Sequence, residues 1–131
     1  MPEPLVIDTC AMRDKPFRHW LRSYHGRKII PAVAYTELSV FLVGKKRKTQ
    51  EKVDALLHSL GIEIEWYRHG EARKAVECAI QYGEFDRNFR DYMIASHAYT
   101  APWIVVTYNT KDFEYLNRRV KTPVELMNRR C

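Results

Sequence analysis

Residues 103–107 read Trp-Ile-Val-Val-Thr and form the clearest buried-strand pattern in the chain. The run is short, apolar and rich in β-branched residues, and it follows Pro102, as is typical of strands buried on both faces. Three further apolar runs lie upstream, at residues 5–7, 28–32 and 62–66. Segments with helical spacing separate these runs. Alternating strands and helices predict a parallel sheet with helices on both of its faces.

The helical segments are marked by apolar residues at intervals of three and four. Gly44 is expected to end the helix at residues 34–43. Asp86 or Asn88 is expected to cap the helix at residues 89–98. Val76 and Ile80 are expected to face inward from the helix at residues 70–82. The pattern predicts helices over residues 17–24, 34–43, 50–60, 70–82 and 89–98.

Length and composition are those of one globular domain, predicted to span residues 1–131. Hydrophobic residues make up 46% of the chain and charged residues 29%, both of which are ordinary for a globular protein. No apolar run approaches the ~20 residues that a membrane-spanning helix needs. The start, Met-Pro-Glu-Pro, does not resemble a signal peptide. We therefore expect a cytoplasmic protein without a membrane partner.

The net charge and the cysteines indicate which partners the protein favours and which structural classes are excluded. The formal net charge is +6, which favours anionic partners such as nucleic acid. The three cysteines, Cys10, Cys78 and Cys131, lie far apart and form no Cys-x-x-Cys pair. This spacing argues against a disulfide framework and against a zinc ribbon. Cys10 and Cys78 are expected to be small apolar fillers in the core.

Four acidic residues stand out by their positions. Asp8 ends the first strand, Glu37 interrupts an apolar helix, Asp91 lies early in a helix, and Asp112 follows the last buried strand by a short loop. Each of these acids could instead have a purely structural role, as a helix cap or as an exposed residue beside an apolar stripe. Ligands gather at the carboxyl ends of parallel strands. Crowded carboxylates there would suit a hard cation such as Mg²⁺ or Mn²⁺.

Four motifs resemble those of PIN-domain nucleases, in the same order along the chain. They are Val-Ile-Asp-Thr at residues 6–9, Tyr-Thr-Glu-Leu at 35–38, Arg-Asp-Tyr-Met-Ile-Ala-Ser-His-Ala at 90–98 and Val-Val-Thr-Tyr-Asn-Thr-Lys-Asp-Phe at 105–113. Size and layout look most like VapC-type toxin ribonucleases of toxin–antitoxin pairs. The resemblance implies an α/β fold with three α/β/α layers around a central, mainly parallel sheet. It also implies hydrolysis of RNA phosphodiester bonds by a metal-activated water.

The resemblance assigns the site residue by residue. Asp8, Glu37 and Asp91 match the first three acids of the family, and would be both metal ligands and catalytic residues. Asn109 stands where many relatives carry an acid, and it offers a carbonyl oxygen without a charge. Asp112, three residues further on, is expected to be a supporting ligand, direct or through water, and completes the catalytic set. The metal would be Mg²⁺ or Mn²⁺, and whether one ion or two bind stays open.

Other residues receive less specific roles. Thr9 and Thr107 are expected to hold the ligands or water in place. His97 is expected to pack rather than react, and Tyr108 either to stack on a base or to cover its loop. Two clusters would either steer the phosphate backbone of RNA or lie in solvated segments. One comprises Lys45, Lys46, Arg47 and Lys48, and the other Arg118, Arg119, Lys121, Arg129 and Arg130.

Partners follow from the same resemblance. RNA is the expected substrate, and a small antitoxin would inhibit the enzyme by placing an Arg or Lys in the acidic pocket. A homodimer is expected, with apolar residues between Tyr35 and Leu60 as one source of its interface. Two alternatives stay open. One is a catalytically weak or inert PIN domain that binds RNA or serves as a scaffold, and the other is a non-toxin nuclease that acts in RNA processing or on structured DNA.

Overall fold

The protein is built on one parallel sheet, seen in a computed structural model that describes residues 2–100 and 102–128. Within these residues the strand order is β3-β2-β1-β4-β5, and every neighbouring pair is parallel. The strands are β1 Leu5–Ile7, β2 Lys28–Pro31, β3 Ile62–Glu65, β4 Ile104–Val106 and β5 Val120–Lys121. The parallel α/β sheet predicted from the alternating pattern is confirmed.

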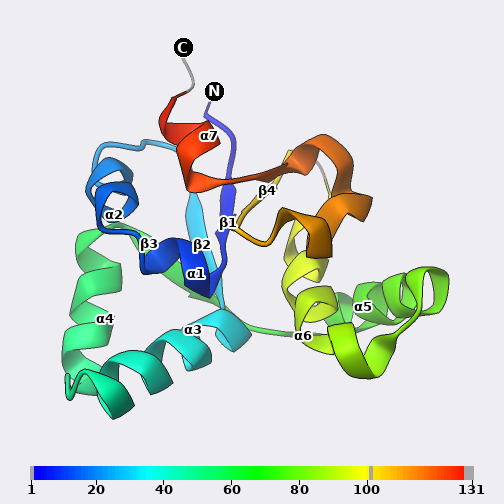
Figure 1. Ribbon diagram of the computed structural model, residues 1–131, viewed down its shortest axis with the longest axis horizontal. Helices are drawn as coiled ribbons and strands as arrows, with labels where there is room; N and C mark the ends of the chain where they lie inside the picture. Colours follow the sequence, from blue (N-terminus) through cyan, green and yellow to red (C-terminus); the bar gives the residue numbers. More distant parts are fainter. Residues whose placement is uncertain (1, 101, 129–131) are drawn as a thin grey trace.

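Helices connect the strands and cover both faces of the sheet. They are α1 Thr9–Met12, α2 Lys15–Leu21, α3 Ala32–Ser39, α4 Gln50–Ser59, α5 His69–Tyr82, α6 Phe85–Ala95 and α7 Pro123–Met127. A π-helical segment, η1 (Val40–Lys45), extends α3, and two 3-10 segments are η2 (Ser96–Ala98) and η3 (Thr110–Arg119). Figure 1 shows α2 and α4 on one side of the strands and α5 and α6 on the other. This is the expected three-layer arrangement.

The core is centred on β1, which pairs with β2 on one side and with β4 on the other. Val6 lies opposite Ile29 and Val105 in these two ladders, and all three side chains are buried. Strands covered on both faces have no solvated side, which is why residues 5–7 and 104–106 are continuously apolar. Phe17 of α2 and Phe113 of η3 belong to the same buried cluster. No helix in the described part of the chain has the length and apolarity needed to span a bilayer.

The carboxyl ends of β1, β2 and β4 lead directly into the segments that carry the candidate residues. Asp8 follows β1 and caps α1, with its side chain accepting a hydrogen bond from the backbone N–H of Thr9. Pro31 ends β2 and precedes the first residue of α3. Thr107 follows β4 and is fully buried. Since parallel strands end at the same edge of a sheet, three distant segments meet there.

One helix end differs from expectation, because Gly44 does not end the second helix. The chain leaves α3 after Ser39 and continues through the π-helical turns of η1, which include Gly44. Gly44 does not have the positive φ of a terminating glycine, and the left-handed residue is instead Arg47, with φ 54°. Because the wider turns of η1 keep the backbone hydrogen-bonded, the helical segment continues past Gly44 and ends at Lys45.

The exposed face of α5 also differs from expectation. Val76 is 56% exposed and Ile80 81% exposed, so the prediction that they face inward is wrong. Ala75 and Cys78 are buried instead, against Tyr92 of α6. The helix buries only this narrow stripe because it packs on a neighbouring helix, which leaves its remaining apolar residues uncovered.

The start of α6 is earlier than predicted, and neither Asp86 nor Asn88 caps it. Gly83 (φ 77°) and Glu84 (φ 52°) both adopt left-handed backbone conformations between α5 and α6. Glu84 is the N-cap residue and makes no side-chain cap hydrogen bond. The tight turn reverses the chain within two residues, so helical geometry resumes at Phe85 before a capping side chain is reached.

Candidate active site

Asp8 lies at the centre of the candidate site and is completely buried. Its Oδ1 accepts a hydrogen bond from the backbone N–H of Thr9 at 2.7 Å, and its Oδ2 accepts one from Oγ1 of Thr107 at 2.8 Å. A buried carboxylate is costly unless hydrogen bonds or cations compensate it. The ends of β1 and β4 supply these donors, so the carboxylate is held in one orientation.

Glu37 reaches the same pocket from α3. Its Oε1 accepts a hydrogen bond from Oγ1 of Thr9 at 2.9 Å, which links the residue after Asp8 to the second turn of α3. Thr36, beside it, is exposed and bonds the carbonyl of Ala32 at 2.8 Å. Glu37 therefore contacts the pocket through Thr9, while its side chain stays 40% exposed.

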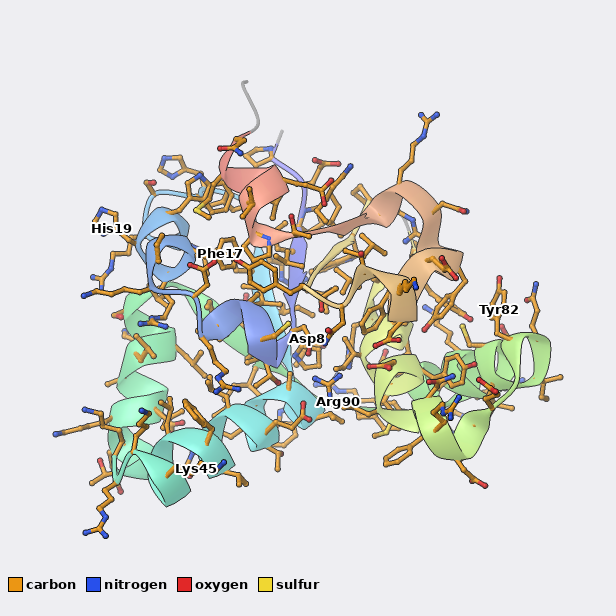
Figure 2. All side chains as sticks on the ribbon, in the orientation of Figure 1. Asp8, Phe17, His19, Lys45, Tyr82 and Arg90 are labelled. Carbon is orange, nitrogen blue, oxygen red and sulfur yellow. The ribbon has the colours of Figure 1, made fainter. Side chains whose placement is uncertain are left out.

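Arg90 and Asp91 complete the pocket from α6. The guanidinium of Arg90 contacts three carboxylates at once. Its Nη2 lies 2.5 Å from Oδ1 of Asp8, its Nε lies 2.6 Å from Oε2 of Glu37, and its Nη1 lies 2.8 Å from Oδ1 of Asp91. Figure 2 shows Arg90 beside Asp8, between α6 and the end of β1. The structure thus brings the three predicted acids together around one cation.

The electrostatics of the pocket reflect an excess of negative charge. The pKa of Asp91 is raised to about 6, mainly by burial; Arg90 opposes the rise, and the negative charges of Asp112 and Asp8 add to it. Burial alone would lower the pKa of Arg90, but its hydrogen bonds and ion pairs with Glu37 and Asp8 outweigh this effect and raise it. Arg90 is therefore a permanent cation that only partly balances the acids around it.

The donor set fits a hard divalent cation in its chemistry. Asp8, Glu37 and Asp91 present carboxylate oxygens, which Mg²⁺ and Mn²⁺ prefer. The described residues nevertheless contain no group of three or more acidic, His or Cys side chains already spaced to hold a metal ion. In this structure the guanidinium of Arg90 lies between the oxygens of these three carboxylates.

The residues after β4 lie at the margin of the pocket. Asn109 is exposed and enters the network through its backbone N–H, which donates to Oγ1 of Thr107 at 3.0 Å. Asp112 is also exposed, and its charge is close enough to raise the pKa of Asp91. The hydroxyl of Tyr108 donates to a carboxylate oxygen of Asp14. Tyr108 is also 43% exposed, and its two expected roles stay predictions.

Cys10 was expected to be a small apolar filler in the core, and this prediction is wrong, because the residue is only partly buried. Its Sγ is 3.8 Å from Oδ2 of Asp8 and 3.4 Å from Oγ1 of Thr107, and it accepts a hydrogen bond from the backbone N–H of Tyr108 at 3.3 Å. Cys10 lies on α1 just after Asp8, so the first helical turn folds its side chain back beneath the carboxylate. Cys78 is buried in the α5–α6 cluster, as expected.

The basic residues and His97 lie outside the acidic pocket. Lys45 lies at the distant end of η1 (Figure 2), and residues 45–48 are all exposed. Lys46 and Lys48 border a groove of about 570 Å³ between α2, η1 and α4, where the guanidinium of Arg13 lies 4.0 Å from the ring centre of Phe41. His97 lines a separate cavity, and burial lowers its pKa.

The second basic cluster is divided. Arg118 and Arg119 lie in η3 and Lys121 in β5, and Arg119 donates to the carbonyl of Ala98. Arg129 and Arg130 lie outside the described residues.

Arg90 is the residue of this pocket that sequence reasoning missed. It immediately precedes Asp91 in the motif at residues 90–98. A long cationic side chain beside an acid in a proposed carboxylate cluster is a candidate counter-ion. The sequence could therefore suggest Arg90 as a counter-ion. It could not show that Arg90 contacts the other two acids, because they lie 53 and 82 residues away in the sequence.

Comparison with known proteins identifies the fold. The PIN domain family model matches residues 6–118. No curated protein sequence matches the chain significantly. Among solved structures, a chain of DNA-bound VapBC from Salmonella typhimurium aligns with a TM-score of 0.63 at 20% identity, covering 92% of this chain and 98% of that one. A chain of VapBC-1 from nontypeable Haemophilus influenzae aligns with a TM-score of 0.62 at 17% identity, covering 89% and 95%.

The family match spans all four motifs singled out in the sequence, and the two structural alignments extend over nearly the whole of each chain. At 17–20% identity the structural likeness shows a shared fold and does not by itself assign an activity. The parallel sheet, the convergence of acids at its carboxyl edge and the family match agree with one another. The chain belongs to the PIN domain family.

Proposed function

We propose that this protein is a metal-dependent endoribonuclease that acts as the toxin of a VapBC-type toxin–antitoxin pair. The observation that carries the proposal is the convergence of Asp8, Glu37 and Asp91 on one cation at the carboxyl edge of the sheet. Membership of the PIN domain family supports nuclease chemistry. The solved structures that share the fold come from VapBC complexes, which supports the toxin assignment.

The roles of the residues follow from their contacts. Asp8, Glu37 and Asp91 would hold Mg²⁺ or Mn²⁺, with Asp112 and the carbonyl oxygen of Asn109 as outer donors. When bound, such an ion supplies Lewis acidity that favours attack by water on phosphorus and stabilises charge on the phosphate oxygens. Asp91 would orient the attacking water.

Thr9 and Thr107 would keep the carboxylates in place. The hydroxyl of Thr9 bonds Glu37 and that of Thr107 bonds Asp8, so each acid keeps one oxygen directed by a neighbour. Such supporting hydrogen bonds fix the orientation and basicity of metal ligands.

RNA is the substrate that we propose, and the cytoplasm is where such a toxin would act. The formal net charge of +6 supports a polyanionic substrate, and the exposed residues 45–48 would attract its phosphates. The groove beside α4 combines apolar residues with Arg13, Arg18 and Lys52. This mixture suits an acidic, amphipathic antitoxin segment. We further propose that the chain forms one domain and a homodimer, and Val40, which is exposed within the stretch between Tyr35 and Leu60, supports the dimer.

The test is cleavage of labelled RNA, tRNA included, with Mg²⁺ or Mn²⁺ and with EDTA as a control. Asp8→Asn and Asp91→Asn should each abolish most cleavage. Asp86→Asn is the matched control, because Asp86 is an exposed acid on the same helix as Asp91. Circular dichroism would confirm that each variant is folded. Unchanged cleavage in both site variants, or cleavage in EDTA, would show that the proposed site is wrong.

One observation favours the second candidate, a weak or inert RNA-binding PIN domain. Asn109 stands at the fourth acidic position of the family's motif, is exposed, and carries no charge. If that loss limits activity, Asn109→Asp should increase cleavage. Arrest of growth on expression, reversed by a small protein encoded beside this one, would distinguish a toxin from an RNA-processing nuclease.

A further inference from the structure

We propose that Arg90 is a built-in counter-ion that closes the acidic pocket in the metal-free protein, and that a divalent ion enters by displacing its guanidinium. The inference rests on the proposed function in one respect, since it takes the pocket to be a metal site. It goes further by assigning a regulatory role to a residue that the proposed nuclease mechanism does not use.

The contacts of Arg90 join three separate elements. Each nitrogen of its guanidinium faces a different carboxylate, at the end of β1, on α3 and on α6, and the three distances lie between 2.5 and 2.8 Å. A surface ion pair rarely involves so many partners, and its net contribution is small. Here one acid, Asp8, is fully buried and the side chain of Asp91 is only 13% exposed. The guanidinium thus neutralises carboxylates of which one, Asp8, has no contact with solvent and another, Asp91, has little.

Removing this cation without a replacement would leave the carboxylates close together and mutually repelling. Such repulsion favours protonation or unfolding, and a buried charge without its partner is strongly destabilising. Arg90 thereby lets the pocket form before any metal is bound. A second cation close to the pocket could take over this role of Arg90. Among the described residues, however, the ion pairs of Asp8 and Asp91 are with Arg90.

The guanidinium and a metal ion cannot occupy the pocket together. A metal ion would be held by the same three carboxylates, whose Oδ1 (Asp8), Oε2 (Glu37) and Oδ1 (Asp91) now face the guanidinium. Two cations at contact distance also repel each other strongly where solvent screening is weak. Displacement is sterically feasible, because the side chain of Arg90 is 27% exposed and has a long flexible stem. The metal therefore competes with Arg90 for the acids.

This competition predicts a weakened apparent metal affinity. A site that is open in only a fraction of molecules binds with its intrinsic dissociation constant divided by that fraction. If Arg90 closes the pocket in roughly nine molecules of ten, apparent binding is about tenfold weaker than in a protein without the guanidinium. The chain would then need about tenfold more metal to reach the same occupancy.

The experiment measures Mn²⁺ binding directly, from the electron paramagnetic resonance signal of the free ion, and requires no RNA. Arg90→Gln should bind Mn²⁺ about tenfold more tightly than the wild type. Arg87→Gln is the matched control, because Arg87 lies one turn earlier on α6 and its side chain is 78% exposed, beside Glu84. It removes the same charge from the same helix and should stay within about twofold of the wild type. Arg90→Lys, which retains the charge without the three-pronged geometry, should lie between.

Thermal unfolding provides a second readout. In EDTA, Arg90→Gln should unfold at a lower temperature than the wild type, because its acids lack a counter-ion. Saturating Mn²⁺ should then raise its unfolding temperature by more than it raises that of the wild type. The intermediate Arg90→Lys keeps the test valid if the glutamine variant does not fold.

The outcomes separate this inference from the proposed function. Arg90 variants that bind Mn²⁺ no more tightly than the wild type overturn the inference, even if the wild type cleaves RNA in a metal-dependent manner. Absence of Mn²⁺ binding in every variant overturns it as well. Tighter binding by Arg90→Gln without cleavage of any RNA supports the inference and refutes the proposed function.

Discussion

Replacing Asp91 by Asn should stabilise the metal-free protein while it removes a residue of the proposed site. Burial raises the pKa of Asp91 from 3.8 to about 6. A folded-state pKa above the unfolded value means that the protonated form favours folding, and that this contribution is lost as the pH rises through about 6. The shift corresponds to about 3 kcal/mol between the two protonation states. An uncharged Asn avoids that penalty, and we expect a gain of about 1–3 kcal/mol at pH 8, because Arg90 loses part of one ion pair.

The assay is urea unfolding of the wild type and Asp91→Asn in EDTA, between pH 4 and pH 8. The stability difference should be largest above pH 6, should shrink as the pH falls through 6, and should level off near pH 4. Asp86→Asn, the exposed control on the same helix, should change stability by less than about 0.5 kcal/mol and should show no such pH dependence. A difference that is independent of pH, or a loss of stability at pH 8, would refute the reasoning from burial.

Three further predictions concern the supports of the site and the exposed helix face. Thr107→Val should cost about 1–2 kcal/mol in urea unfolding, because the buried Oδ2 of Asp8 loses its donor; no loss would mean that the hydroxyl is dispensable. Phe113→Ala should cost about 3–5 kcal/mol in the same assay, since its ring is fully buried in the main core, and a loss below about 1 kcal/mol would contradict that placement. Ile80→Ser should change stability by less than about 0.5 kcal/mol, whereas a loss above about 2 kcal/mol would show that this face of α5 is covered.

The three acids of the pocket are held by several separate elements of the fold, unlike ordinary surface carboxylates. Asp8 is held by donors from the ends of β1 and β4, while Glu37 and Asp91 come from helices that follow β2 and β3. A change in any one of these elements would alter the distances around Arg90. Stability and metal binding are therefore expected to be coupled in this protein, as they are wherever buried charge is stored at a functional site.

The strands, the direction of the sheet and the edge where the acids meet can be inferred from local sequence patterns. Apolar runs such as residues 5–7 and 104–106 are local patterns, and alternation with helices leaves a parallel arrangement as the simplest solution. Asp8 and Thr107 follow their strands directly, so their place at the carboxyl edge required no knowledge of packing. The hydrogen bonds by which Thr49 caps α4 and Thr122 caps α7 are equally local, since a cap acts within three residues.

The contacts between distant side chains follow from the packing of whole elements and not from local sequence. Arg90 and Asp8 are 82 residues apart, and their contact depends on how α6 packs beside α3, which no local pattern specifies. The exposure of Ile80 depends likewise on α5 packing against α6 and not under the sheet. Residue type and periodicity report what a side chain prefers, whereas the partner that satisfies a buried charge is fixed by the relative placement of whole elements.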